Sequence, residues 1–131
     1  MAAIDTTTTE EIPPEMRRLI VTSPGASVAD CKIEIEAVST TTPTYTQVLV
    51  KVAAAAVNPS DYGSWYKSKK ESYPMPMGFE GSGVVVATGS KVASLRFPIG
   101  THVGFIKFAG GSYSEYVPVN IFTEHGISHA G

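Results

Sequence analysis

The sequence predicts a mainly β domain, built as a barrel or a sandwich. Short runs of apolar and β-branched residues recur along the chain, and segments rich in glycine or proline separate them. Very little of the chain has the 3.6-residue apolar period of an amphipathic helix. With 131 residues, of which 43% are hydrophobic and 17% charged, the chain has room for one domain with its own core.

The first half of the chain contains three predicted strands. Residues 18–23 form the first strand, which ends at a Ser-Pro-Gly turn. Residues 32–36 alternate apolar and charged side chains, the period-2 pattern of a half-buried strand. After a polar loop that contains proline, a longer strand covers residues 47–57.

The second half contains a predicted short helix and three further strands. The helix covers residues 60–67, with Asp61 near its start, where a carboxylate suits the helix dipole. Residues 81–88 form a strand. Residues 102–108 and 112–119 are expected to form a strand pair around two consecutive glycines.

Composition argues against several classes of partner. Ten basic residues against 12 acidic ones give a net charge of -2. The chain therefore lacks the basic surplus typical of nucleic-acid binding and the strong charge typical of binding to a lipid surface. The longest apolar runs, such as residues 52–57, are too short to span a bilayer, and we expect no membrane insertion. Cys31 is the single cysteine, so it cannot form an internal disulfide, and no Cys/His cluster has zinc-ligand spacing.

The first 16 residues are predicted to be a flexible arm, because they are rich in threonine, contain a Pro-Pro pair and show no apolar period. They lack the basic and apolar regions of a secretory signal. Four acidic residues, with no arginine before Arg17, also argue against an uncleaved transit peptide. We therefore expect the protein in the cytoplasm, or in an organelle if a transit peptide has already been removed.

Three segments hold the residues of greatest chemical interest: residues 57–61 (Val-Asn-Pro-Ser-Asp), 78–83 (Gly-Phe-Glu-Gly-Ser-Gly) and 110–116 (Gly-Gly-Ser-Tyr-Ser-Glu-Tyr). Each alone has a structural explanation, since Asn-Pro is a turn signal and glycines beside strands mark bulges or close backbone approach. Their order and spacing together are far more specific than any one of them.

With these motifs, residues 17–119 resemble the N-terminal GroES-like domain of the medium-chain dehydrogenase/reductase superfamily, most closely its zinc-free quinone oxidoreductase and enoyl reductase branch. The likeness runs through residues 47–52, 57–61, 76–92 and 111–117. It implies a partly open β-barrel with one or two short helices. It also implies a reductase that acts on a quinone or an activated double bond, with hydride supplied by NADPH.

Two positions place the chain in the zinc-free branch. Zinc-dependent alcohol dehydrogenases that resemble this pattern carry Cys where this chain has Asn58, and His where it has Phe79. A catalytic zinc needs about three N, S or O ligands from the protein, and these two side chains offer neither thiolate nor imidazole. The four-cysteine lobe that binds structural zinc is absent too, because Cys31 is alone. We therefore expect no metal ligands.

The resemblance also implies the roles of the site residues. Asn58 would face the nicotinamide and the substrate, with its amide orienting a carbonyl, and it also suits the cap of the following helix. Asp61 and Glu80 are expected to support it as hydrogen-bonded carboxylates. Tyr66 and Tyr73 are candidate proton donors from an aromatic rim, although aromatic residues near a barrel mouth more often pack than catalyse.

The nucleotide-binding motif, a strand followed by G-x-G-x-x-G and a helix, does not occur in the sequence. The predicted organisation is a flexible arm (1–16), a GroES-like domain (17–119) and a truncated linker toward a nucleotide-binding domain (120–131). We expect no cofactor for this chain alone, NADPH in the full-length family and no catalysis by the isolated chain. The expected partner is the missing Rossmann domain or another protein. The alternative is a non-catalytic accessory or structural subunit of a larger assembly.

Overall fold

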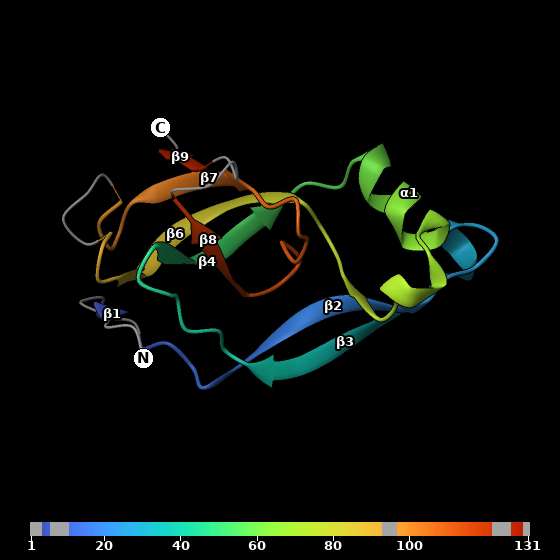
Figure 1. Ribbon diagram of the computed structural model, residues 1–131, viewed down its shortest axis with the longest axis horizontal. Helices are drawn as coiled ribbons and strands as arrows, with labels where there is room; N and C mark the ends of the chain where they lie inside the picture. Colours follow the sequence, from blue (N-terminus) through green and yellow to red (C-terminus); the bar gives the residue numbers. More distant parts are fainter. Residues whose placement is uncertain (1–3, 6–10, 93–96, 122–126, 130–131) are drawn as a thin grey trace.

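Two antiparallel β-sheets and a helix lie along one long axis (Figure 1). This computed structural model describes residues 4–5, 11–92, 97–121 and 127–129. The strands of the larger sheet are β1 (Ile4–Asp5), β4 (Gln47–Ala55), β6 (Glu80–Gly89), β7 (His102–Ile106), β8 (Tyr116–Asn120) and β9 (Ile127–His129). Their order is β8-β4-β6-β7-β9, and β1 pairs with β6.

The smaller sheet has the order β3-β2-β5, with α1 packed nearby (Figure 1). Its strands are β2 (Glu15–Ser23), β3 (Lys32–Ser39) and β5 (Met75–Pro76). The α-helix is α1 (Pro59–Lys67), and two short 3-10 helices are η1 (Val28–Asp30) and η2 (Lys70–Ser72). The mainly β prediction is confirmed, and the sheets of the described residues do not close into a complete barrel.

Two strands begin three or more residues from the predicted position, and β6 begins one residue early, at Glu80. β2 begins at Glu15, three residues earlier, because Met16 is buried in a hydrophobic cluster and its backbone pairs with β3. β8 begins at Tyr116, four residues later than predicted. The segment before it bonds to other parts of the chain instead, because the N–H groups of Tyr113 and Glu115 donate to the carbonyls of Met77 and Arg17, and Ser114 forms only an isolated bridge with Arg18. The predicted pairing of this strand with residues 102–108 is wrong, because β8 pairs with β4 whereas β7 lies between β6 and β9.

The ends of the chain are only partly described. Within the predicted arm 1–16, Ile4–Asp5 forms β1 and pairs with the last residues of β6. Residues 1–3 and 6–10 of that arm lie outside the described residues. The same holds for residues 122–126 and 130–131 of the predicted linker 120–131, so its role stays a prediction.

The larger sheet buries side chains on both faces. One cluster, on one face, combines alternate residues of β4, β7 and β8 with Val85 of β6 and with two residues from outside the strands. It consists of Val48, Val50, Val85, Val92, Phe97, Val103, Phe105, Val117 and Val119. A second cluster, on the other face, consists of Met16, Leu49, Val86, Ala87 and Tyr116. Burial of these apolar groups is the main stabilising contribution to the sheet.

A β-bulge in β6 explains why two consecutive residues belong to one cluster. The register passes from Leu49 opposite Ala87 to Val50 opposite Val85, which leaves Val86 as the additional residue. A second irregularity leaves Ala53 unpaired in β4, shortly before the strand ends. The bulge lets Val86 and Ala87 both contribute to the second cluster.

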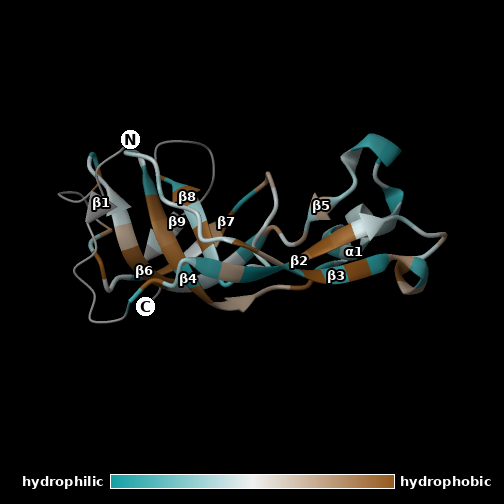
Figure 2. Cartoon of the chain, turned by 90° about the horizontal axis from the view of Figure 1, so that it is seen from below, coloured by the Kyte–Doolittle hydropathy of each residue, from teal (hydrophilic) through white to brown (hydrophobic). Residues whose placement is uncertain are grey.

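A third hydrophobic cluster holds α1 against the smaller sheet. Val21 of β2, Trp65 of α1 and Met77 form its buried part, with Tyr73 and Tyr113 partly buried around them. Figure 2 shows hydrophobic stretches along the strands of both sheets, whereas much of the chain around α1 is hydrophilic. In the described part of the chain, no helix combines the length and apolarity needed to cross a membrane.

Candidate functional site

The candidate site lies at the start of α1, where β4 ends. Asn58 precedes a proline and has φ of -116° and ψ of 161°, the extended backbone that this position favours. Pro59 then begins the helix, where its missing N–H costs nothing. The backbone N–H of Asn58 donates a hydrogen bond of 2.7 Å to Oδ2 of Asp61, as in a capping box. Asn58 is therefore the N-cap residue, which confirms its predicted structural role.

The side chain of Asn58 is held by Glu80, the first residue of β6. Nδ2 of Asn58 donates a hydrogen bond of 2.8 Å to Oε1 of Glu80. A bond to a carboxylate is stronger than one between neutral groups, and it orients the amide plane. The side-chain amide has a second N–H, which this bond leaves available for another acceptor.

Asp61 supports the same turn from the helix side. Its side chain is fully buried, and Oδ1 has no hydrogen-bond partner among the described residues. Burial, and in second place the charge of Asp61, raises the pKa of the Tyr113 phenol above its ordinary value. The structure thus brings Asn58, Asp61 and Glu80 together, and their functional roles stay predictions.

The two tyrosines predicted as proton donors have other contacts. The hydroxyl of Tyr73 donates to the carbonyl of Trp65 at 2.7 Å, which satisfies a carbonyl of the last turn of α1. Tyr66 is half-buried, and Nζ of Lys67 lies 5.3 Å from the centre of its ring. These contacts give both tyrosines a structural role. Their predicted role as proton donors stays a prediction.

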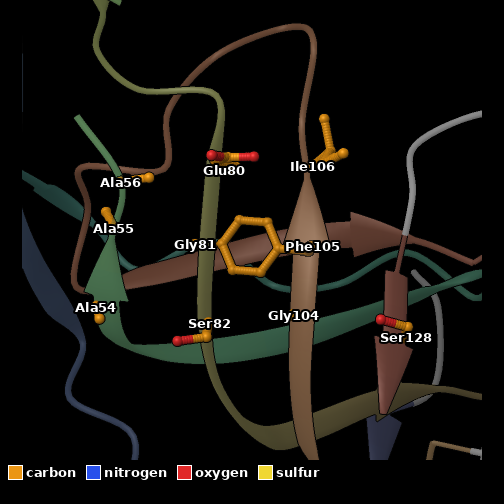
Figure 3. Close-up of a pocket in the computed structure, with 10 residues that line it drawn as sticks. All are labelled: Ala54, Ala55, Ala56, Glu80, Gly81, Ser82, Gly104, Phe105, Ile106 and Ser128. Carbon is orange, nitrogen blue, oxygen red and sulfur yellow. The ribbon is translucent and has the colours of Figure 1, made fainter. Parts of the chain in front are cut away.

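A cleft of about 600 Å³ adjoins Glu80 (Figure 3). Its walls come from the end of β4, the start of β6, β7 and one residue of β9, and they are formed by Ala54, Ala55, Ala56, Glu80, Gly81, Ser82, Gly104, Phe105, Ile106 and Ser128. Among these ten residues, Glu80 is the one with a charged side chain. The cleft is therefore mostly apolar, with one carboxylate at its edge.

Gly81, which lines the cleft, must be a glycine because β4 and β7 both approach its backbone closely. A Cβ at this position would lie 2.8 Å from the carbonyl oxygen of Ala54 and 3.1 Å from Cζ of Phe105. Figure 3 shows the Phe105 ring lying across the backbone of Gly81. A larger residue would displace the wall that carries Glu80.

Metal ligands are not gathered in this region. In the described ranges, no three side chains of His, Cys, Asp or Glu are grouped so that they could hold a metal ion. Phe79 occupies the position beside Glu80, and its backbone carbonyl accepts a hydrogen bond from the N–H of Lys107. Independence of zinc stays a prediction.

One residue of this region, Tyr113, was not expected from the sequence. It belongs to the 110–116 motif, but nothing in the local pattern assigns it to the site. Its hydroxyl donates a hydrogen bond of 2.8 Å to the carbonyl of Ala56, 57 residues away in the sequence. A contact between residues so far apart in the sequence leaves no periodic pattern in the sequence that could have indicated it.

Fold and site together define a domain of the GroES-like class, as found in medium-chain oxidoreductases. The family model of the alcohol dehydrogenase GroES-like domain matches residues 44–124, and the chain belongs to this family. A curated relative is 2-methylene-furan-3-one reductase of Solanum lycopersicum, 37% identical over 98 residues. That match covers 72% of this chain and 25% of the tomato protein.

Solved structures agree with the assignment. The quinone oxidoreductase from Coxiella burnetii has a TM-score of 0.71 and 28% identity, over 88% of this chain and 37% of that one. The Escherichia coli quinone oxidoreductase complexed with NADPH has a TM-score of 0.64 and 24% identity, over 85% of this chain and 32% of its own, and shares the fold. The predicted family is confirmed, and the chain spans well under half of each of these relatives.

Proposed function

We propose that this chain is the substrate-side domain of a zinc-independent, NADPH-dependent reductase of quinones or of conjugated carbonyl compounds. The observation that carries the proposal is the hydrogen bond of 2.8 Å between Nδ2 of Asn58 and Oε1 of Glu80. This bond joins the Asn58 amide to the carboxylate of Glu80, and Glu80 is one of the residues that line the cleft. Quinone oxidoreductase and reductase activities named for similar proteins support the reaction class.

In this function Asn58 stabilises the substrate's carbonyl oxygen. One N–H of its amide is bonded to Glu80, and the other would donate to the carbonyl of the bound substrate. When hydride adds to a conjugated carbonyl, negative charge moves onto that oxygen, and a fixed donor stabilises it. A proton must then reach the substrate to complete the reduction. A neutral amide would thus perform the polarising task for which zinc-dependent relatives use a metal.

The cleft suits an uncharged, largely apolar substrate. Its volume of about 600 Å³ lies within the range of small-molecule sites, roughly 300–1,000 Å³. Alanine, glycine and Phe105 form most of its wall. NADPH supplies hydride when bound, but the negative charge of Glu80 does not suit its phosphates. A separate nucleotide-binding domain would have to hold them, so this chain would contribute one wall of the complete site.

The test is the full-length gene product that contains these residues, assayed for NADPH oxidation with a quinone and with a conjugated enone. We expect Asn58→Ala to lower kcat by about 100-fold, the effect of removing one oxyanion donor. Asn120→Ala is the matched control, because Asn120 lies in β8 and its amide donates to Thr46. A strong zinc chelator should leave the activity unchanged.

Three results would contradict the proposal in different ways. Loss of activity on chelation would refute zinc independence while leaving the reductase assignment in place. If the protein fails to oxidise NADPH with the quinone and with the enone, and remains bound to a larger assembly during purification, the accessory-subunit alternative is correct instead. Equal activity of the Asn58 and Asn120 variants would refute the role of the amide.

A further inference from the structure

Tyr113 connects three segments of the chain through separate hydrogen bonds. Its hydroxyl donates to the carbonyl of Ala56 at 2.8 Å, and its backbone N–H donates to the carbonyl of Met77 at 3.0 Å. Its own carbonyl accepts from the N–H of Leu19 in β2 at 2.9 Å. One residue thus ties together the end of β4, the segment before β6 and the smaller sheet.

Two of these bonds reach the segments that carry Asn58 and Glu80. Ala56 lies two residues before Asn58, and Met77 lies three residues before Glu80. The N–H of Ala56 also donates to the carbonyl of Glu80 at 3.2 Å. The Asn58–Glu80 pair, Ala56 and Tyr113 therefore belong to one hydrogen-bonded arrangement, in which the Tyr113 phenol binds the segment that follows β4.

The surroundings of the Tyr113 ring restrict its position. The Trp65 ring meets it edge-on, with centres 6.2 Å apart and an interplanar angle of 71°. On another side Gly78, with φ of 90°, has no room for a side chain, since a Cβ would lie 2.4 Å from Cδ1 of Tyr113 and 2.1 Å from Oγ of Ser112. The ordinary pKa of a phenol, 10.0, already keeps the hydroxyl a donor at neutral pH, and burial raises the pKa of Tyr113 further.

We propose that Tyr113 is a positioning residue for the reduction, whose hydroxyl fixes the backbone at Ala56 and so sets the distance between Asn58 and Glu80. This inference rests on the proposed function of Asn58. Without the hydroxyl, the carbonyl of Ala56 loses its bond, and the turn at Asn58 gains freedom relative to β6. The amide then spends less time bonded to Glu80 and is less well oriented toward a substrate carbonyl.

The test compares Tyr113→Phe with Tyr62→Phe in the 131-residue chain by NMR. The first variant keeps the ring against Trp65 and removes the hydroxyl. The second is a matched control, because the Tyr62 ring meets Trp65 edge-on at the same 6.2 Å but is 38% exposed. The sequence contains two asparagines, Asn58 and Asn120, so the side-chain amide signals of the Asn120–Thr46 pair serve as an internal reference.

In Tyr113→Phe we expect the Asn58 side-chain amide to shift toward the values of a solvent-exposed asparagine and to exchange with water about fivefold to tenfold faster. The Asn120 signals should stay in place, and Tyr62→Phe should change neither. In the full-length enzyme, Tyr113→Phe should lower kcat by about tenfold with little change in KM, since orientation rather than binding is affected.

Unchanged Asn58 signals in a folded Tyr113→Phe protein would overturn the positioning role, whatever the activity of the enzyme. Equal shifts at Asn58 and Asn120 would also overturn it, because they would indicate a general loss of order. By contrast, if Asn58→Ala is fully active while the NMR changes occur as expected, the proposed function fails and the local effect of Tyr113 stands.

Discussion

Replacement of Gly83 by alanine should disrupt the centre of the larger sheet. Gly83 lies in β6, opposite Val52 of β4 on one side and Val103 of β7 on the other. An added Cβ would lie 2.0 Å from the carbonyl oxygen of Lys51 and 2.9 Å from its carbonyl carbon. Both obstacles are backbone atoms, so no side-chain rotation can relieve the overlap.

The size of the effect follows from the geometry. To bring the new contact to an ordinary van der Waals distance, β4 and β6 must separate locally by about 1 Å or more. Such a separation takes neighbouring ladder bonds beyond the useful range for N–H···O. Overpacking costs about 1–3 kcal/mol, and two weakened bonds add about 1 kcal/mol each. We expect the free energy of unfolding to fall by about 3–5 kcal/mol, a large share of the stability of an ordinary domain.

Urea unfolding followed by circular dichroism measures this change. For an m value of about 1–3 kcal/mol/M, the midpoint of Gly83→Ala should fall by at least about 1 M. Gly104→Ala in the neighbouring strand β7 is the control, because its nearest contact would be the oxygen of Gly81 at 4.0 Å. It should leave stability unchanged or raise it by about 0.4–1 kcal/mol. If both variants unfold at the wild-type midpoint, the inference that β4 and β6 leave no room for a side chain at Gly83 is wrong.

Three further predictions concern the helix, an exposed ion pair and the core. Gly63→Ala should stabilise the protein by about 1 kcal/mol and raise Tm, because apart from the neighbouring backbone of α1 itself no atom lies within 4 Å of the added Cβ. A lower Tm would contradict this. The side-chain hydrogen bond from Arg17, and then its backbone N–H, lowers the pKa of Glu115 below 4.5. The stabilisation from this pair is therefore complete above pH 4.5 and is lost as the pH falls through the lowered pKa. Glu115→Gln should have a lower Tm than the wild type at neutral pH, and the two Tm values should become equal in acid. Leu49→Ala removes a side chain that is 1% exposed and should cost about 2–5 kcal/mol in urea unfolding, with a cost below 1 kcal/mol contradicting its place in the core.

Local patterns predicted those parts of the fold that depend on neighbouring residues. The strand expected over residues 47–57 is β4 (Gln47–Ala55), and the helix expected over residues 60–67 is α1 (Pro59–Lys67). The Asn-Pro-Ser-Asp sequence also indicated the start of the helix, because a cap and an acidic residue three positions later satisfy N–H groups within one turn. These features need no information from distant parts of the chain.

Features that depend on pairing between distant segments had no such signal. The consecutive valines of β6 do not indicate that Val86 is a bulge, because a continuous apolar run has no alternation to interrupt. The bond between Asn58 and Glu80 spans 22 residues, and family resemblance rather than local chemistry placed both in one site. The two-residue strand β1 is too short to show a period, and only its pairing with β6 defines it.

The third hydrophobic cluster has a practical consequence for optical measurements. Cys31 and Trp65 are the single cysteine and the single tryptophan of the chain. The thiol of Cys31 lies 3.4 Å from the carbonyl oxygen of Trp65, beside α1. A thiol-reactive nitroxide or dye on Cys31 would therefore lie next to the one indole and quench its fluorescence. The wild-type sequence thus contains a quencher attachment point and a fluorophore that together report any movement of α1 away from the smaller sheet.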